Sequence, residues 1–362
     1  MTELDLSGVD LRKPGPNRRE LFLRFYEFHL RYRSHPGGVY YALPYLADAH
    51  GWDEEQRAWC AWINGNTQNP VTTLLLMEAG DRPERADTML NWFADHQPNL
   101  QWDTDRRYHR TKFINATLGY LDAISRAGGQ GAYWRRAARG GWSSQWAAAT
   151  ALPTMGRLSA WSYLEYLRLL GVGNVSDSDT LMLGDRSGSK SHRNGLLLVD
   201  GQDDRMWWKR NPDYRPDYTP DDLDHLASLG EDLLGEVRRR TNNHPDAGYL
   251  TLESALCTFK SWHVPNRRYA GVYNDLLHDR IRRAEGIHGR RFDALWDARR
   301  DSLPEFLRME DNPDDPGCVP VKQNHFLNTG RPVVIGHDYP DLTSEYDRLV
   351  TVGEYRAERR TP

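Results

Sequence analysis

Apolar side chains recur every third or fourth position along most of the chain, which is the spacing of one buried face of an α-helix. Three clear stripes of this kind are Leu21, Phe25, Phe28 and Tyr32; Leu158, Trp161, Leu164 and Leu167; and Tyr269, Val272, Tyr273, Leu276, Leu277 and Ile281. Runs that resemble strands are few and short, namely Leu196–Val199 and Val333–Ile335. The pattern therefore predicts an all-α, predominantly helical fold with few short strands.

Turn and capping residues divide this helical pattern into elements. Asp53, which is followed by two glutamates, is typical of a helix start. Further helices are expected over 83–95, 221–240 and 290–308. The predicted organisation is an N-terminal leader (1–17), a helical catalytic domain (18–310) that could divide into two lobes around a cleft (18–150 and 151–310), and an extended C-terminal tail (311–362).

Composition limits the classes of function. The chain of 362 residues is 39% hydrophobic and 27% charged, which indicates a globular protein. Its formal net charge of −4 argues against a generally basic surface, so any contact with DNA must come from local clusters of cations. The 13 Trp and 18 Tyr side chains could stack on bases as well as pack a core.

The cysteines and the N-terminus predict a cytoplasmic protein. Cys60, Cys257 and Cys318 are far apart and match no zinc-ligand spacing, which is typical of a reducing compartment. The N-terminus has no apolar secretory segment, and no apolar run approaches the ~20 residues of a membrane helix. Motifs of P-loop nucleotide binding, dinucleotide binding, HExxH zinc hydrolases and GxSxG hydrolases are absent.

The stretch 152–194 contains a sharp turn, a helix and a charged loop. Its turn, L-P-T-M-G, resembles the hairpin of the helix–hairpin–helix DNA glycosylases, which carry L-P-G-x-G and an aspartate about 20 residues later. Here that aspartate is Asp179, followed by Thr180, and Thr154 stands where those enzymes have glycine. The N–H groups of such a hairpin can bind a DNA phosphate. The alternative is an ordinary corner between helices with a solvated loop.

Four amide side chains lie within six positions: Asn64, Asn66, Gln68 and Asn69. Amides both donate and accept hydrogen bonds, which suits the Watson–Crick edge of a base or an amino-acid group. The alternative is helix capping, in which Asn66 or Asn69 closes one helix and Pro70 begins the next.

A cluster of cations stands just ahead of another apolar helix and comprises Arg106, Arg107, Arg110 and Lys112. Cations at a helix start are unfavourable with the helix dipole. The cluster is more easily explained if it binds DNA phosphates, and a solvated surface is the alternative.

The stretch 253–275 also carries charges that could serve a reaction. Glu253 and Lys260 are seven positions apart, so they share one helix face. Lys260, Arg267 and Arg268 could together neutralise a diphosphate. The alternative is ordinary ion pairing of these cations with Glu253 and Asp275.

Four segments together resemble the phage amino acid:DNA transferases: F-H-L-R-Y-R-S-H-P-G-G-V-Y-Y, W-I-N-G-N-T-Q-N-P-V-T, L-P-T-M-G-R-L-S-A-W-S-Y-L-E and F-K-S-W-H-V-P-N-R-R-Y-A-G-V-Y-N-D. These enzymes belong with the α-glutamyl/putrescinyl thymine pyrophosphorylases, a group of glycosylase-like fold. The resemblance covers most of the chain, 21–300. It implies that an amino acid or polyamine displaces pyrophosphate from 5-hydroxymethyluracil in phage DNA, after a DNA kinase has diphosphorylated the hydroxyl group, in the bacterial host cytoplasm.

The implied reaction needs several kinds of residue. The base is expected to be extruded from the duplex, and Trp62 or Trp161 could stack on it. Asp179, Asp185 or His192 could accept the proton of the nucleophile. No cofactor is certain, although Mg²⁺ could accompany the diphosphate with a carboxylate such as Asp185.

The resemblance and the residue patterns together give the candidate sites. The candidate catalytic residues are Asp179, Asp185, His192 and Lys260. The candidate substrate-binding residues are Asn64, Asn66, Gln68, Asn69, Arg157, Lys190, Arg193, Asn194, Glu253, Arg267, Arg268, Tyr269 and Asp275. The candidate DNA-binding residues are Arg106, Arg107, Arg110 and Lys112.

Two other functions fit parts of the pattern. A DNA base glycosylase would use Asp179 to stabilise a positively charged sugar and would release a free base. A non-catalytic DNA-binding protein would not need an amide-rich pocket, and its function would survive the loss of Asp185 or Lys260.

Overall fold

The computed structural model describes residues 18–31, 42–102, 106–184, 190–202, 205–206, 218–260 and 276–302. Within these ranges the chain is helical and contains no strand, which confirms the predicted all-α fold. The leader (1–17), the tail (311–362) and the strand expected at 333–335 lie outside the described residues, so the division into domains stays a prediction.

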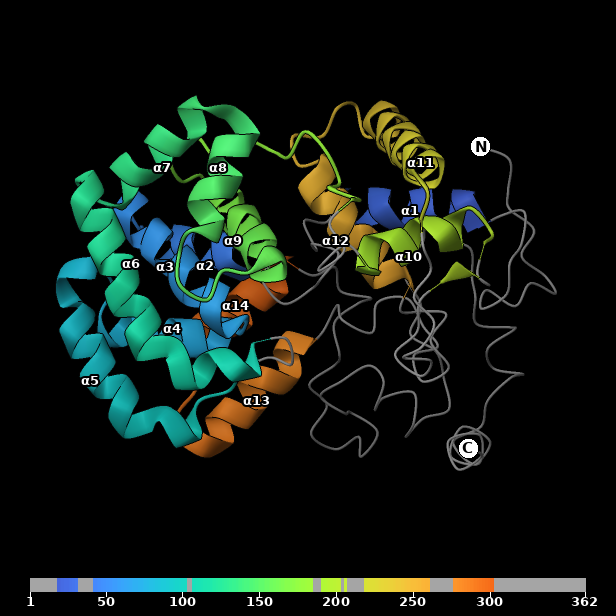
Figure 1. The fold of residues 1–362 in the computed structure, drawn as a ribbon. Coiled ribbons are helices and arrows are strands. Elements are labelled where there is room, and N and C mark those ends of the chain that lie inside the picture. Colours follow the sequence, from blue (N-terminus) through green and yellow to red (C-terminus); the bar gives the residue numbers. More distant parts are fainter. Residues whose placement is uncertain are drawn as a thin grey trace, which may run out of the picture. The chain divides into compact units, whose positions relative to one another are not determined.

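Figure 1 shows the helices of the described residues in their order along the chain. They are α1 (Arg18–Arg31), α2 (Ala42–Ala49), α3 (Glu54–Thr67), α4 (Pro70–Ala79), α5 (Ala86–His96), α6 (Phe113–Ala127), α7 (Gln130–Arg139), α8 (Gly141–Thr150), α9 (Arg157–Leu169), α10 (Lys190–Val199), α11 (Pro220–Arg240), α12 (Tyr249–Lys260), α13 (Leu276–His288) and α14 (Asp293–Ser302). Three 3-10 helices also occur, η1 (Pro83–Arg85), η2 (Gln97–Asn99) and η3 (Arg107–Lys112). None of the helices described is both long and apolar enough to cross a membrane.

These helices belong to two compact units, each built from segments that are separated in the sequence. The first unit contains α1 and α10 to α12. The second unit contains α2 to α9 and α14, together with most of α13.

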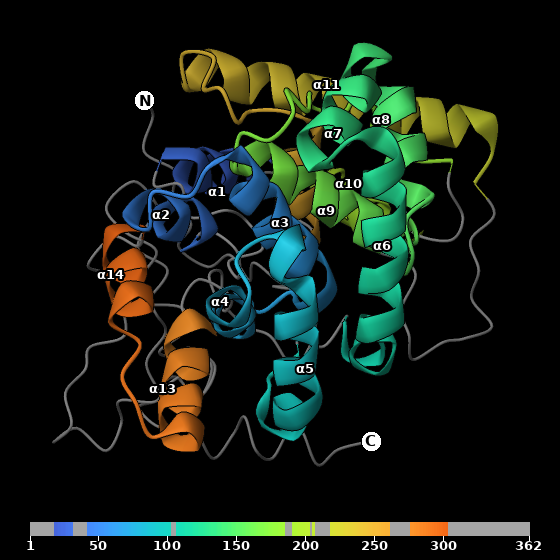
Figure 2. The same cartoon turned by 90° about the vertical axis from the view of Figure 1, so that its left-hand side faces the viewer.

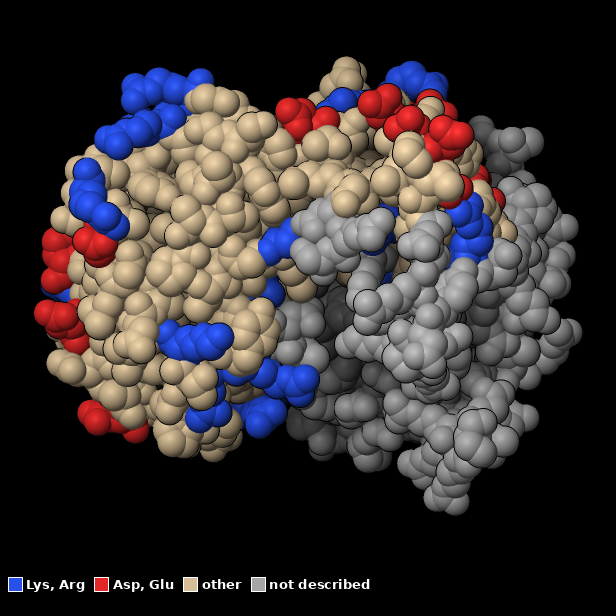
Figure 3. Space-filling model, in the orientation of Figure 1, with Lys and Arg blue, Asp and Glu red and all other residues tan. Residues whose placement is uncertain are grey.

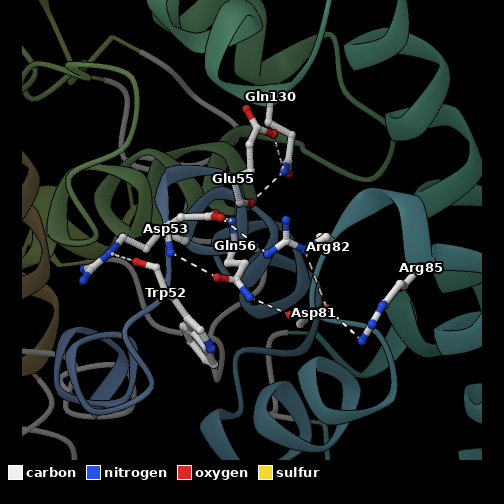
Figure 4. A network of polar contacts seen from close by, with 9 residues as sticks. Trp52, Asp53, Glu55, Gln56, Asp81, Arg82, Arg85 and Gln130 are labelled. Carbon is white, nitrogen blue, oxygen red and sulfur yellow. Dashed lines mark hydrogen bonds and ion pairs between the residues drawn. The ribbon is translucent and has the colours of Figure 1, made fainter.

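Helix α3 lies at the centre of the second unit, among α4, α7 and α9 (Figures 1 and 2). Asp53 caps its start, as predicted, and the cap is a reciprocal capping box: the Asp53 side chain accepts from the Gln56 N–H (2.9 Å), and the Gln56 side chain accepts from the Asp53 N–H (3.1 Å). Gln56 also donates to Asp81, and Gln130 of α7 donates to the Glu55 carbonyl (Figure 4). The first turn of α3 is therefore tied to α7 and to the connection that follows α4.

The middle of α3 carries the aromatic core of this unit. Trp62 stacks face to face on Tyr120 of α6, with ring centroids 4.1 Å apart, and Tyr163 of α9 meets it edge-on at 6.0 Å. The indole N–H of Trp59 donates to the Gly80 carbonyl at 2.8 Å. Buried aromatic rings of this size contribute large apolar area, and their polar atoms find partners within the core.

The core of the first unit is the close pairing of α10 with α12. Gly195 permits it, because a Cβ at that position would lie 2.6 Å from the carbonyl oxygen of Leu256. Helix α1 covers α12 through Phe22 and Phe25, whose rings lie 5.2 and 5.7 Å from that of Phe259.

The expected strand at Leu196–Val199 is wrong, because these residues form the last turn of α10. All four side chains are buried. A short run that is apolar on every side shows no periodicity, so the sequence pattern could not distinguish a buried helical turn from a strand.

We predict that Gly195→Ala destabilises the protein by ~1–3 kcal/mol, since the new methyl group forces α10 and α12 apart. The matched control is Gly235→Ala in α11, where a Cβ meets no atom within 4 Å. That variant should be neutral or more stable by ~0.5–1 kcal/mol, because alanine is the better helix former. Denaturant unfolding monitored by circular dichroism measures both, and equal effects would contradict the close-packing argument.

Candidate functional site

Two of the four amide residues have structural roles at the junction of α3 and α4. Asn69 caps α4, since its Oδ1 accepts from the N–H groups of Val71 (3.1 Å) and Thr72 (3.0 Å). Asn64 is fully buried, and its Oδ1 accepts from the Thr73 hydroxyl at 3.0 Å. Asn69 therefore caps a helix, as in the alternative to substrate binding, but it begins α4 rather than closing α3.

Asn66 faces a different part of the second unit. Its Nδ2 donates to the Trp62 carbonyl (3.0 Å), while its Oδ1 accepts from the Thr154 hydroxyl (2.8 Å) and lies 3.1 Å from Nδ1 of His109. Because an amide oxygen can only accept, Nδ1 of His109 carries the proton in this assignment. Its Nε2 is then an acceptor, 3.5 Å from the Ser159 hydroxyl.

His109 is held in its neutral form. Burial, together with the smaller effect of the nearby positive charges of Arg106 and Lys112, lowers its pKa from 6.5 to about 3. The side chain is fully buried. A neutral ring with a fixed tautomer orients its neighbours, whereas an imidazole of such low basicity is poorly matched to proton transfer near neutral pH.

The hairpin 152–156 joins α8 to α9, where the sequence predicted a tight turn. Thr154 has a φ of +67°, a left-handed conformation that favours glycine and is rare for a β-branched residue. Glycines admit the residues on either side of it: a Cβ at Gly119 would lie 2.8 Å from Pro153, and one at Gly65 would lie 3.1 Å from Met155. Three consecutive side chains, those of Pro153, Thr154 and Met155, therefore hold the hairpin against α6 and α3.

The cation cluster ahead of α6 divides into a buried and an exposed part. Arg106 is fully buried, and its Nε donates to the Gly65 carbonyl at 2.9 Å. Arg107 and Lys112 are exposed, and Arg110 is partly exposed. Figure 3 shows Lys and Arg side chains gathered over the lower part of the second unit, where η3 and α13 lie in Figure 1. Arg107, Arg110 and Lys112 of η3 can therefore reach a DNA phosphate from the surface, whereas the buried Arg106 cannot.

In the first unit, α10 and α12 bring together two residues predicted for different roles. Nδ1 of His192 lies 3.2 Å from a carboxylate oxygen of Glu253, and both side chains are buried. The next residue, Arg193, places its guanidinium 4.6 Å from the centre of the Tyr218 ring. Asn194 is also buried in this helix.

Lys260 ends α12. Its Nζ lies 3.2 Å from the Cys257 thiol and 3.3 Å from the Cys257 carbonyl. The two residues are partly exposed, so the ammonium group remains accessible from solvent.

The remaining predicted residues lie in varied surroundings. Asp179 is exposed in the loop after α9, and Gln68 ends α3 with a partly exposed side chain. Arg157 is buried at the start of α9, with its guanidinium 4.7 Å from the Trp161 ring centre. Outside the described residues lie Asp185, Arg267, Arg268, Tyr269 and Asp275, as does the side chain of Lys190.

Trp62 and Trp161 are not open to a stacked base. Trp62 is buried against Tyr120, and Trp161 is 2% exposed, with Trp142 edge-on to it at 5.5 Å. The sequence suggested both residues because tryptophan suits base stacking as well as core packing. Here the packing role applies, because α3 and α9 are interior helices.

Sequence reasoning missed His109 and Ser159. The signal for His109 was its position in R-R-Y-H-R-T-K, a histidine among four cations, where a buried neutral ring can anchor a basic segment. Ser159 carried no comparable signal, because its partner lies 50 positions away.

We predict that His109 makes stability fall as the pH is lowered from 6.5 towards 3. The unfolded state takes up a proton at the ordinary pKa of 6.5, whereas the folded state does not until about 3, so protons favour unfolding in that window. The contribution is at most ~1.4 kcal/mol per pH unit. Denaturant unfolding at several pH values should show a weaker pH dependence for His109→Gln than for the wild type. The exposed His225→Gln variant serves as the control, and identical slopes for His109→Gln and the wild type would contradict the prediction.

Known proteins resemble this chain over most of the elements described above. The family model of the amino acid:DNA transferases matches residues 53–268, which include α3, η3, the hairpin, α10 and α12. The serinyltransferase of Salmonella phage ViI is 27% identical over 301 residues, covering 78% of this chain and 72% of the relative. No solved structure matches the chain. Since the family model spans more than half of the sequence, the chain belongs to the amino acid:DNA transferase family.

Proposed function

We propose that this transferase joins an amino acid or another amine to the 5-methylene carbon of diphosphorylated 5-hydroxymethyluracil in double-stranded phage DNA and displaces pyrophosphate. The observation that carries the proposal is the family match over 53–268. The phage relative named a serinyltransferase supports an amino acid as the transferred group. A kinase acting on hydroxymethyluracil in DNA would supply the substrate, and the reaction would take place in the cytoplasm of the bacterial host.

The chemical step exchanges one bond for another at the methylene carbon. The nitrogen or hydroxyl oxygen of the nucleophile forms a bond to this carbon, and the carbon–oxygen bond to the diphosphate breaks. Pyrophosphate leaves with the bonding electron pair, either during or before attack. The nucleophile loses a proton, so the enzyme must provide a base close to the reacting nitrogen or oxygen.

The His192–Glu253 pair is the best candidate for that base among the described residues. The Glu253 carboxylate lies 3.2 Å from Nδ1 of His192 and orients the ring. The side chain of Asp179 is exposed. A carboxylate in contact with bulk water is less suitable as the base for this reaction. We therefore assign proton acceptance to His192 and orientation of its ring to Glu253.

Cations at or near α10 and α12, the helices that carry His192 and Glu253, would neutralise the charge of the leaving pyrophosphate. Lys260 at the end of α12 is one, and Lys190, Arg267 and Arg268 stay predictions for the same role. No group of three His, Cys, Asp or Glu side chains suited to a metal ion occurs in the described ranges. If Mg²⁺ takes part, oxygens of the diphosphate would supply most of its ligands, with Asp185 the predicted carboxylate.

DNA would be bound by the second unit. Arg107, Arg110 and Lys112 of η3 carry exposed or partly exposed positive charge and would contact the phosphates. The N–H groups of Leu152, Met155 and Gly156 in the hairpin donate within the turn instead. Extrusion of the target base costs a few kcal/mol and would present the methylene carbon to the nucleophile.

Nucleoside mass spectrometry tests the proposal. Duplex DNA that carries diphosphorylated hydroxymethyluracil is incubated with the protein and single amino acids or polyamines, and the digest is searched for an adduct on the 5-methylene group. We expect one adduct and an equal amount of released pyrophosphate. Abasic sites in place of an adduct would identify a glycosylase and refute the proposal, as would DNA binding without turnover of any of the nucleophiles.

We predict that His192→Gln lowers kcat by ~10²–10⁴, the usual contribution of a general base. Glu253→Gln keeps a hydrogen-bonding side chain of the same shape and should lower kcat less. The matched control is His225→Gln, since His225 also pairs with a carboxylate, that of Asp200 at 2.9 Å, but is exposed. Thermal melting shows whether each variant folds. A folded His192→Gln enzyme with normal kcat would remove His192 from the mechanism.

A further inference from the structure

Large apolar side chains are exposed mainly around η3 and the hairpin. Five such residues occur in the described chain, and all but Ile287 belong to η3, to the first two turns of α6 or to the first turn of α9: Tyr108, Ile114, Leu118 and Leu158. Tyr108 is the most exposed of them, at 58%. Exposed apolar side chains that gather in one region indicate a surface that is covered by a partner.

The charges around Tyr108 indicate what that partner is. Arg107 precedes Tyr108 and is exposed, and Nζ of Lys112 lies 5.9 Å from the centre of the Tyr108 ring. An aromatic ring among cations suits a nucleic acid, because the ring stacks on bases while the cations bind the phosphates that flank them. An apolar protein surface would bring no negative charge to this region, whereas DNA brings phosphates.

One amide oxygen connects this surface to the hairpin. Oδ1 of Asn66 lies 2.8 Å from the Thr154 hydroxyl and 3.1 Å from His109, the residue that follows Tyr108. The rings of Tyr108 and His109 are in edge contact, with centroids 4.5 Å apart. Thr154 makes its bond from a left-handed backbone conformation, and such strain persists only where the surrounding contacts enforce it.

We propose that Tyr108 stacks on a base of the bound DNA, and that Asn66 holds η3 and the hairpin 152–156 in register as one docking surface. Tyr108 is a direct DNA contact, whereas Asn66 and Thr154 are positioning residues that act through the two segments they join. This inference rests on the proposed action on DNA and specifies the surface that DNA meets.

Equilibrium binding to unmodified duplex DNA at several salt concentrations tests the contact by Tyr108. Tyr108→Ala should bind roughly 5- to 150-fold more weakly, the equivalent of the ~1–3 kcal/mol of one stacked base. Its dependence of log Kd on log salt should be unchanged, and Tyr108→Phe should restore binding because it keeps the ring. Arg107→Gln is the contrasting variant, since it should lower the salt slope by about 0.9.

The outcomes of that experiment are distinct. Wild-type affinity for Tyr108→Ala, or failure of the folded Phe variant to restore binding, overturns the stacking contact. Because the binding assay uses unmodified DNA and no nucleophile, it stands apart from the adduct assay. An active transferase with unaltered Tyr108→Ala binding would reject this surface alone, while normal Tyr108 results without any adduct would reject the transfer chemistry alone.

Hydroxyl deletion at Thr154 tests the link. Thr154→Val keeps the shape of the side chain but loses the bond to Asn66, and should weaken DNA binding roughly 2- to 10-fold, as the loss of one hydrogen bond would. Thr154→Ser keeps the hydroxyl and should bind normally. Thr150→Val removes a hydroxyl that bonds only within α8 and should bind DNA like the wild type. If Thr154→Val is less stable but binds DNA normally, the bond is structural and the positioning role is rejected.

Discussion

The second unit depends on a polar interaction buried inside it, the shared oxygen of Asn66. A buried amide that lacks partners costs several kcal/mol, so a side chain of this kind is tolerated only where its groups are satisfied. Here each group of the Asn66 amide has a partner, and the partners come from three different elements: α3 itself, the hairpin and the η3 segment. An apolar residue at this position would fill the same volume but would remove the acceptor of Nδ1 of His109 and break the hydrogen bond that joins the hairpin to α3. The amide therefore specifies which loops meet, in addition to filling space.

Close backbone approach makes this arrangement possible. Gly65 and Gly119 remove the side chains that would keep the hairpin away from α3 and α6, while the Gly65 carbonyl accepts from the buried Arg106. A buried guanidinium is costly unless its hydrogen bonds are made, so this bond fixes the start of η3 as firmly as the histidine fixes its middle. The exposed cations of η3 are thus carried on a rigid element, although the element itself is short and lies on the surface.

The first unit also combines a glycine at a close contact with a buried histidine. Gly195 lets α10 and α12 pack closely, and that spacing brings His192 to within 3.2 Å of Glu253. A histidine and a carboxylate in contact inside a core couple their protonation, because each charge stabilises the other where water is excluded. In the second unit, by contrast, burial lowers the pKa of His109 and keeps the ring neutral, and the neighbouring charges of Arg106 and Lys112 act in the same direction. The same residue type is therefore proposed for proton transfer in the first unit, whereas in the second unit it orients its neighbours.

The sequence by itself determined the helical class, the helix start at Asp53, the turn at 152–156 and, through the resemblance of four segments, the family. These features depend on local periodicity and on residues close together in the chain, which a sequence displays directly. It also marked the amide-rich segment, but it could not show that Asn69 caps a helix while Asn66 binds residues 43 and 88 positions away. Only the tertiary structure decided that Arg106 is buried beside exposed Arg107, that Trp62 faces Tyr120, and that Leu196–Val199 is helical. Burial depends on which elements meet, and that choice is made by contacts between distant parts of the chain.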